Sequence, residues 1–141
     1  MNAILASGLI FSLTGHAQDF RDRSGDALLG RRTIPLILPQ TIARWSLILA
    51  MSGLTLGLIK LWEPPVLVAA LFGLLGVITS AKFAIDYSEE QDRKTFRWYE
   101  LWLIMAHFLP LFERFSNEDV AVSRPIRVML MGNYRFFESI F

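Results

Sequence analysis

The 141-residue chain contains no cysteine, which excludes disulfide bonds, cysteine-ligated zinc and thiol chemistry. It also has little excess charge, because 14 Lys and Arg residues nearly balance 13 Asp and Glu residues. The formal net charge of +1 gives no broad basic surface, so nucleic acid is not expected as a partner. No basic region precedes the apolar residues 1–15, which therefore do not resemble a secretory signal. We interpret them as the end of a helix whose beginning is missing.

Apolar residues, by contrast, are abundant. They make up 53% of the chain, and its mean hydropathy of +0.41 is higher than that of a typical soluble domain. At 1.5 Å per residue, residues 42–62 and 66–85 are long enough to cross the ~30 Å hydrocarbon core of a bilayer. Trp45 and Trp62 flank the first of these segments, as interfacial aromatics do. We therefore expect an all-α, polytopic transmembrane helix bundle with helices near residues 1–15, 42–62, 66–85 and 98–112.

Small residues within these segments predict where helices pack. Gly53 and Gly57 form a G-x-x-x-G pair, which we interpret as a packing feature. The segment from Gly73 to Ala81 also offers a strip of small residues to a neighbouring helix. His107, in the last apolar segment, is expected to pack in the interior.

A charged stretch, residues 86–97, separates the last two apolar segments. Metal binding by its acidic side chains is conceivable, but their spacing favours a solvated cap with i,i+4 ion pairs. The expected pairs are Glu89–Arg93 and Glu90–Lys94.

The most informative stretch runs from residue 16 to residue 35 and reads HAQDFRDRSGDALLGRRTIP. If it is helical, Asp19, Asp22 and Asp26 lie within roughly 60° of one face, where their repulsion can be relieved by a hard cation such as Mg²⁺. Gly30 is expected to end this helix and Pro35 to prevent it from resuming. Arg31 and Arg32 would then follow the acidic face, as guanidinium groups that hold a phosphate. The pattern predicts a diphosphate site, with a solvated polar loop as the alternative.

The segment DFRDRSGDALLGRRTIP, Asp19 to Pro35, resembles the second aspartate-rich motif of the UbiA family of intramembrane prenyltransferases. The resemblance implies that Asp22 and Asp26 are the paired catalytic aspartates that bind Mg²⁺ and a prenyl diphosphate, with Asp19 as an assisting metal ligand. It also implies that Arg31 and Arg32 bind the substrate. The family's first motif, of the N-D-x-x-D type, does not occur in this chain. We therefore expect residues 1–113 to be the C-terminal half of a UbiA-like domain, followed by a tail, residues 114–141, with no assigned role.

The resemblance implies a Mg²⁺-dependent membrane enzyme that transfers an isoprenoid group from a prenyl diphosphate to an acceptor. Two alternatives stay open: a terpene cyclase of the same type, and a non-catalytic membrane remnant or interaction protein that retains one motif. A chain with one motif is expected to be inactive by itself. The acceptor, the isoprenoid length and the organelle cannot be deduced from these residues.

Positive charge predicts the orientation of the integral membrane protein. If the segments 42–62, 66–85 and 98–112 all span the bilayer, nine Lys and Arg residues lie on the side of the motif and five on the other. This asymmetry places the motif loop in the cytosol.

Overall fold

The computed structural model describes residues 2–112, and within this range every regular element is a helix. Four elements precede the two long helices: α1 (Asn2–Thr14), α2 (Ala17–Phe20), α3 (Arg23–Leu28) and α4 (Ile34–Ile37). The long helices are α5 (Gln40–Trp62) and α6 (Val66–Ile85), and a last helix occupies residues 89–112. The predicted all-α fold is confirmed. The predicted tail, residues 114–141, lies outside the described residues.

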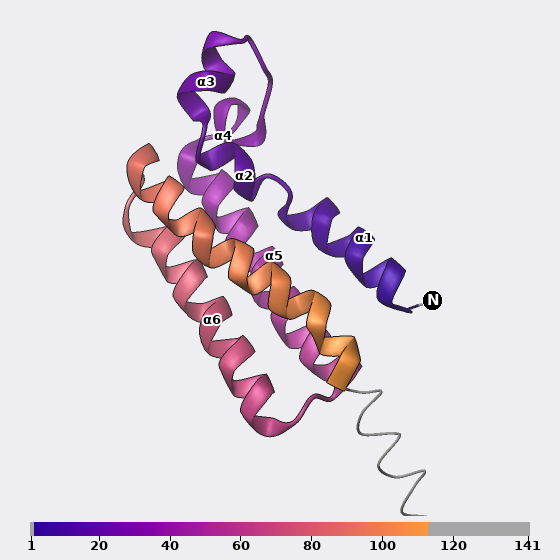
Figure 1. The fold of residues 1–141 in the computed structure, drawn as a ribbon. Helices are drawn as coiled ribbons and strands as arrows, with labels where there is room; N and C mark the ends of the chain where they lie inside the picture. Colours follow the sequence, from indigo (N-terminus) through magenta and orange to yellow (C-terminus); the bar gives the residue numbers. More distant parts are fainter. Residues whose placement is uncertain (1, 113–141) are drawn as a thin grey trace, which may run out of the picture.

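The long helices form the body of the structure. α5, α6 and the last helix run alongside one another, and α1 lies beside this bundle (Figure 1). The short helices α2, α3 and α4 gather at the end of the bundle where α6 is followed by the last helix (Figure 1). α5 and α6 are long and apolar enough to cross a membrane. The fold therefore presents the motif at one end of two membrane-length helices.

Proline and a left-handed residue set the boundaries of the long helices. Pro39 directly precedes α5 and Pro65 directly precedes α6, and Glu63 ends α5 with a left-handed backbone (φ 40°). The last helix begins nine residues earlier than predicted from hydropathy, at residue 89 instead of 98. Its charged first turns are stabilised by the predicted ion pairs Glu89–Arg93 and Glu90–Lys94, each 2.7 Å long.

Small and aromatic residues fill the contact between α5, α6 and the last helix. The Trp102 indole stacks on Phe72 with ring centroids 5.8 Å apart, and its Nε1 donates a 2.9 Å hydrogen bond to Thr55 Oγ1. Gly76 makes room for this contact, because a Cβ at Gly76 would lie 2.9 Å from Thr55 Oγ1. The small-residue strip predicted on α6 is therefore a packing surface at Gly76.

Two packing predictions were wrong. A Cβ at Gly53 or at Gly57 would meet no atom of another segment within 4 Å in the described part of the chain. These glycines line a pocket of about 700 Å³ between α1 and α5, whose lining is made entirely of apolar side chains and glycine. His107 is exposed instead of interior, and its ring contacts Phe11 of α1, which is itself exposed.

Candidate functional site

The motif is not the single helix that the sequence suggested. Asp22 precedes α3 with a non-helical backbone (φ −135°, ψ 35°), so the chain changes direction between α2 and α3. Gly30 ends this region in the left-handed conformation (φ +66°), as predicted. The helix does resume for one turn as α4, because Pro35 lies in its first turn, where proline needs no N–H partner.

The broken backbone nevertheless brings the three predicted metal ligands together. Asp19, Asp22 and Asp26 all line one polar pocket of about 230 Å³. The other lining residues are Gln18, Arg21, Arg31 and Thr33. Asp26 is buried, Asp19 is half-buried and Asp22 is exposed. The pocket thus contains one deeply placed carboxylate and one that is open to solvent.

The predicted phosphate-binding arginines occupy different places. Arg31 Nη1 lies 3.2 Å from Asp26 Oδ1 and forms an ion pair across the pocket. Arg32 is exposed and is not among the residues that line this pocket. The structure therefore groups Arg31 with the three carboxylates and leaves Arg32 out of the pocket lining.

Two carboxylates of the pocket repel each other. Burial raises the pKa of Asp19 above its usual value, and the nearby charge of Asp26 raises it further. Within residues 2–112, no three acidic or histidine side chains converge closely enough to enclose a metal ion. Mg²⁺ does not need such an enclosure, since it commonly keeps several waters and binds one or two carboxylates together with substrate phosphates. The oxygen donors of this open pocket fit that mode of binding.

Gly25 is a further residue of the site. It lies within the aspartate-rich motif, but the sequence analysis assigned it no role. A Cβ at Gly25 would lie 2.5 Å from Asp22 Oδ1 and 3.0 Å from Oδ2. The Asp22 carboxylate therefore lies over the bare Cα of Gly25. Any larger residue at position 25 would displace the Asp22 carboxylate.

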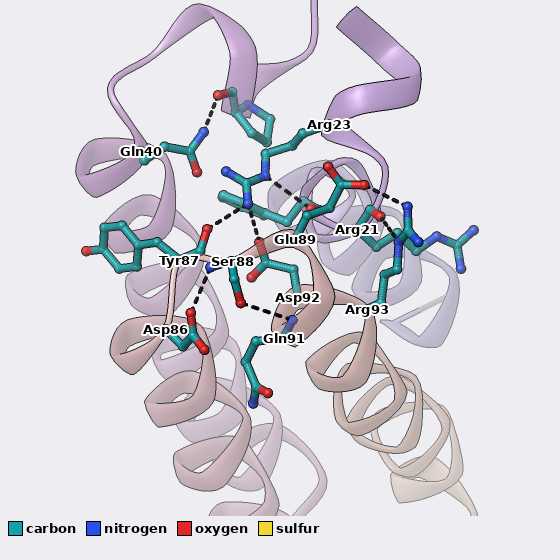
Figure 2. Close-up of polar contacts among 12 residues, drawn as sticks. Arg21, Arg23, Gln40, Asp86, Tyr87, Ser88, Glu89, Gln91, Asp92 and Arg93 are labelled. Carbon is teal, nitrogen blue, oxygen red and sulfur yellow. Dashed lines mark hydrogen bonds and ion pairs between the residues drawn. The ribbon is translucent and has the colours of Figure 1, made fainter.

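The charged segment 86–97 is only partly the solvated cap that we predicted. Asp92 and Arg44 are both buried, and they form two hydrogen bonds of 2.8 and 2.7 Å with each other. Arg23, next to Asp22 in the motif, also donates a 3.1 Å bond to Asp92 (Figure 2). One signal pointed to this contact: Arg44 lies in a helix that is otherwise uncharged up to Lys60, and a charge in such a helix requires a partner.

Fold and site together define a helical membrane protein with an acidic and basic pocket beside its membrane-length helices. Residues 2–104 match the model of the UbiA prenyltransferase family, and the chain belongs to this family. It is 44% identical over 116 residues to the fumagillin beta-trans-bergamotene synthase of Aspergillus fumigatus. The matched region covers 82% of this chain and 40% of that relative, so the chain spans about two-fifths of its length. No solved structure matches the chain.

Proposed function

We propose that this chain contributes the Asp22–Asp26 half of a Mg²⁺-dependent membrane site that ionises a prenyl diphosphate. The observation that carries the proposal is that three carboxylates and Arg31 line one pocket. Their residues match the family's aspartate-rich motif, and α5 and α6 supply the membrane-length helices that a lipid-tailed substrate requires.

Bound Mg²⁺ supplies positive charge that stabilises the diphosphate as a leaving group. Asp22, exposed at the mouth of the pocket, and Asp26, buried within it, would hold this ion, with Asp19 as a third carboxylate. Arg31, whose side chain is exposed, can exchange its contact with Asp26 for phosphate oxygens, and the neighbouring Arg32, also exposed, can bind the same group. As the carbon–oxygen bond breaks, its electron pair leaves with the diphosphate and an allylic cation remains. These arginines would stabilise the charge that develops on the leaving oxygens.

The fate of the cation separates two candidate reactions. The 44% identity to a protein named as a bergamotene synthase favours cyclisation, in which the ionised isoprenoid closes on itself. Membership of a prenyltransferase family supports the second candidate, transfer to a separate acceptor. Both reactions require the same ionising site.

The experiment compares two proteins expressed in yeast microsomes: the chain itself, and the Aspergillus relative with this chain in place of its matching segment. Each is incubated with Mg²⁺ and geranyl, farnesyl or geranylgeranyl diphosphate, with and without aromatic acceptors. Released diphosphate reports ionisation, and mass spectrometry separates cyclic hydrocarbons from prenylated acceptors. We expect turnover in the exchanged protein and none in the chain alone.

Asp22→Asn and Asp26→Asn should each reduce diphosphate release on the order of 100-fold or more, because an amide cannot supply the charge that holds the metal. Asp86→Asn is the matched control, since Asp86 is exposed at the end of α6, does not line the pocket and accepts a hydrogen bond from the Ser88 N–H. Wild-type rates for both motif variants at saturating Mg²⁺ would show that the site is wrongly assigned. No turnover in the exchanged protein, with normal folding, would support the non-catalytic alternative.

A further inference from the structure

The buried pair Arg44–Asp92 connects α5 to the last helix directly behind the motif. Besides its two bonds to Asp92, the Arg44 guanidinium donates a 3.0 Å bond to the carbonyl of Phe83. It also lies 4.8 Å from the ring centroid of Phe20 and 4.4 Å from that of Tyr87. A buried carboxylate is costly unless it is paired and hydrogen-bonded, and Asp92 satisfies both conditions. The pair therefore lies against α2, through the contact of the Arg44 guanidinium with the Phe20 ring.

Arg23 connects the buried Arg44–Asp92 pair to the motif. Its guanidinium donates to Asp92 Oδ2 at 3.1 Å and to the carbonyl of Tyr87 at 2.7 Å (Figure 2). Its Nε donates a 3.3 Å bond to the carbonyl of Phe20. One side chain thus bonds to the last helix, to the segment before it and to the motif backbone two residues before Asp22.

Two further contacts hold the motif from the same side. Glu89 accepts hydrogen bonds from the backbone N–H of Ser24 at 3.0 Å and from its hydroxyl at 2.8 Å. Arg93 Nε donates a 3.0 Å bond to the carbonyl of Arg21, and Arg93 is itself paired with Glu89 (Figure 2).

These bonds involve the residues on both sides of Asp22 and leave Asp22 itself available. Phe20, Arg21, Arg23 and Ser24 are each bonded to the 87–93 segment or to a side chain anchored in it. The Asp22 carboxylate makes no capping bond to α3. Side chains that served only to join the helices would not need to bond to the motif backbone at three points.

We propose that Asp92 and Glu89 are positioning residues, which fix the Asp22 carboxylate for the metal and diphosphate by holding Arg23 and Ser24. The inference rests on the proposed function of the Asp22–Asp26 pocket, and it assigns a task to a charged segment outside the aspartate-rich motif. Partners that hold a metal ligand in place typically change metal affinity by about 10- to 100-fold when they are removed.

The test measures Mg²⁺ binding without relying on turnover. The full chain, in detergent, is unfolded thermally at fixed pyrophosphate over a series of Mg²⁺ concentrations, and the midpoint of the stabilisation gives the apparent Mg²⁺ affinity. Asp92→Asn would leave the buried Arg44 and the half-buried Arg23 without their carboxylate and could prevent folding, so the variants are Arg23→Lys and Glu89→Gln. Lysine keeps the charge of Arg23 but not the planar fork that reaches three acceptors.

Arg23→Lys should raise the Mg²⁺ midpoint about 10-fold or more, and Glu89→Gln should raise it in the same direction, while the unfolding temperature in EDTA stays close to that of the wild type. The matched control is Glu90→Gln, the same substitution one residue along, because Glu90 is paired with the exposed Lys94. An unchanged midpoint in both variants, or an equal shift in Glu90→Gln, would overturn the positioning role. An unchanged midpoint in Asp22→Asn would instead contradict the proposed metal site itself.

Discussion

The Asp22 carboxylate occupies space that a side chain at Gly25 would fill, with Oδ1 only 2.5 Å from the position of a Cβ. Gly25 lies in α3, where glycine is unfavourable for helix stability, so its presence has a local cost. That cost is understandable if the position of the Asp22 carboxylate matters more than the stability of one short helix.

Gly25→Ala should therefore displace the carboxylate without unfolding the chain. Because a ligand shifted by about 1 Å can cost on the order of 100-fold in rate, we expect a loss of that order in diphosphate release. Gly8→Ala is the control, since a Cβ at Gly8 meets nothing within 4 Å. Equal activity in the two variants would show that the close approach of Asp22 to Gly25 has no functional role.

The two arginines predicted to bind phosphate, Arg31 and Arg32, should respond differently to substitution. Arg31→Lys replaces a fork that contacts Asp26, whereas Arg32→Lys changes an exposed residue outside the pocket lining. We expect Arg32→Lys to lower turnover less than Asp22→Asn does, and Arg31→Lys to lower it more than Arg32→Lys does. Steady-state rates at saturating Mg²⁺ measure this order, and a reversed order would make Arg32 the principal phosphate ligand.

Asp19 should make stability depend on pH when metal is absent. Burial and the charge of Asp26 raise its folded pKa above the unfolded value of about 4, so the folded state binds this proton more tightly. The stabilisation by the proton is complete below the unfolded pKa and is lost as pH rises through the folded pKa. In EDTA, Asp19→Asn should unfold at the wild-type temperature at low pH and at a higher temperature near neutral pH.

Asp86 provides a control of opposite sign for that experiment. Hydrogen bonds from the backbone and side chain of Ser88 lower the pKa of Asp86. Its contribution to stability is present above the unfolded pKa and is lost as pH falls through the folded value. Asp86→Asn should therefore be less stable than the wild type near neutral pH, with a difference that shrinks in acid.

The contact at Gly76 predicts that alanine substitution changes stability very differently at two glycines of α6. Gly76→Ala would place a Cβ 2.9 Å from Thr55 Oγ1, while Gly73→Ala meets nothing within 4 Å. Overpacking of this kind costs about 1–3 kcal/mol, whereas alanine in an open helical position is neutral or stabilising. Thermal unfolding in detergent should separate the two variants, and equal stabilities would contradict the packing of α6 against α5.

The absence of native cysteines allows a direct test of topology. Leu28→Cys lies in the motif and Glu63→Cys lies at the opposite end of α5, and both positions are exposed. In sealed vesicles the two thiols should react with a membrane-impermeant maleimide from opposite sides, with position 28 on the cytosolic side. Reaction of both from one side would reject the predicted orientation.

Helix positions were largely predictable because hydropathy and proline are local signals. The predicted segment 66–85 coincides with α6, and α5 begins two residues before the predicted start because Pro39 fixes it. The start of the last helix was missed because its first turns are charged, and charge in a sequence does not distinguish a loop from an exposed helix.

The grouping of the three aspartates was predicted from a single helix that the structure does not contain. A continuous helix would place Asp19, Asp22 and Asp26 on one face, but two short helices, α2 and α3, and the turn between them bring the three to one pocket instead. The buried contact of Asp92 with Arg44 was not predicted, because the neighbours of Asp92 form an ordinary i,i+4 pattern and Arg44 lies 48 residues away. Contacts at that separation depend on how the bundle folds, which no local pattern contains.

These long separations have a consequence for how the protein is made. Arg23 and Asp92 are 69 residues apart, and Ser24 and Glu89 are 65 apart. Chains are synthesised from the N-terminus, so the motif is made before the residues of the 87–93 segment that bond to it. The motif therefore lacks its hydrogen bonds to Asp92 and Glu89 until the last helix has been made and has packed against the bundle.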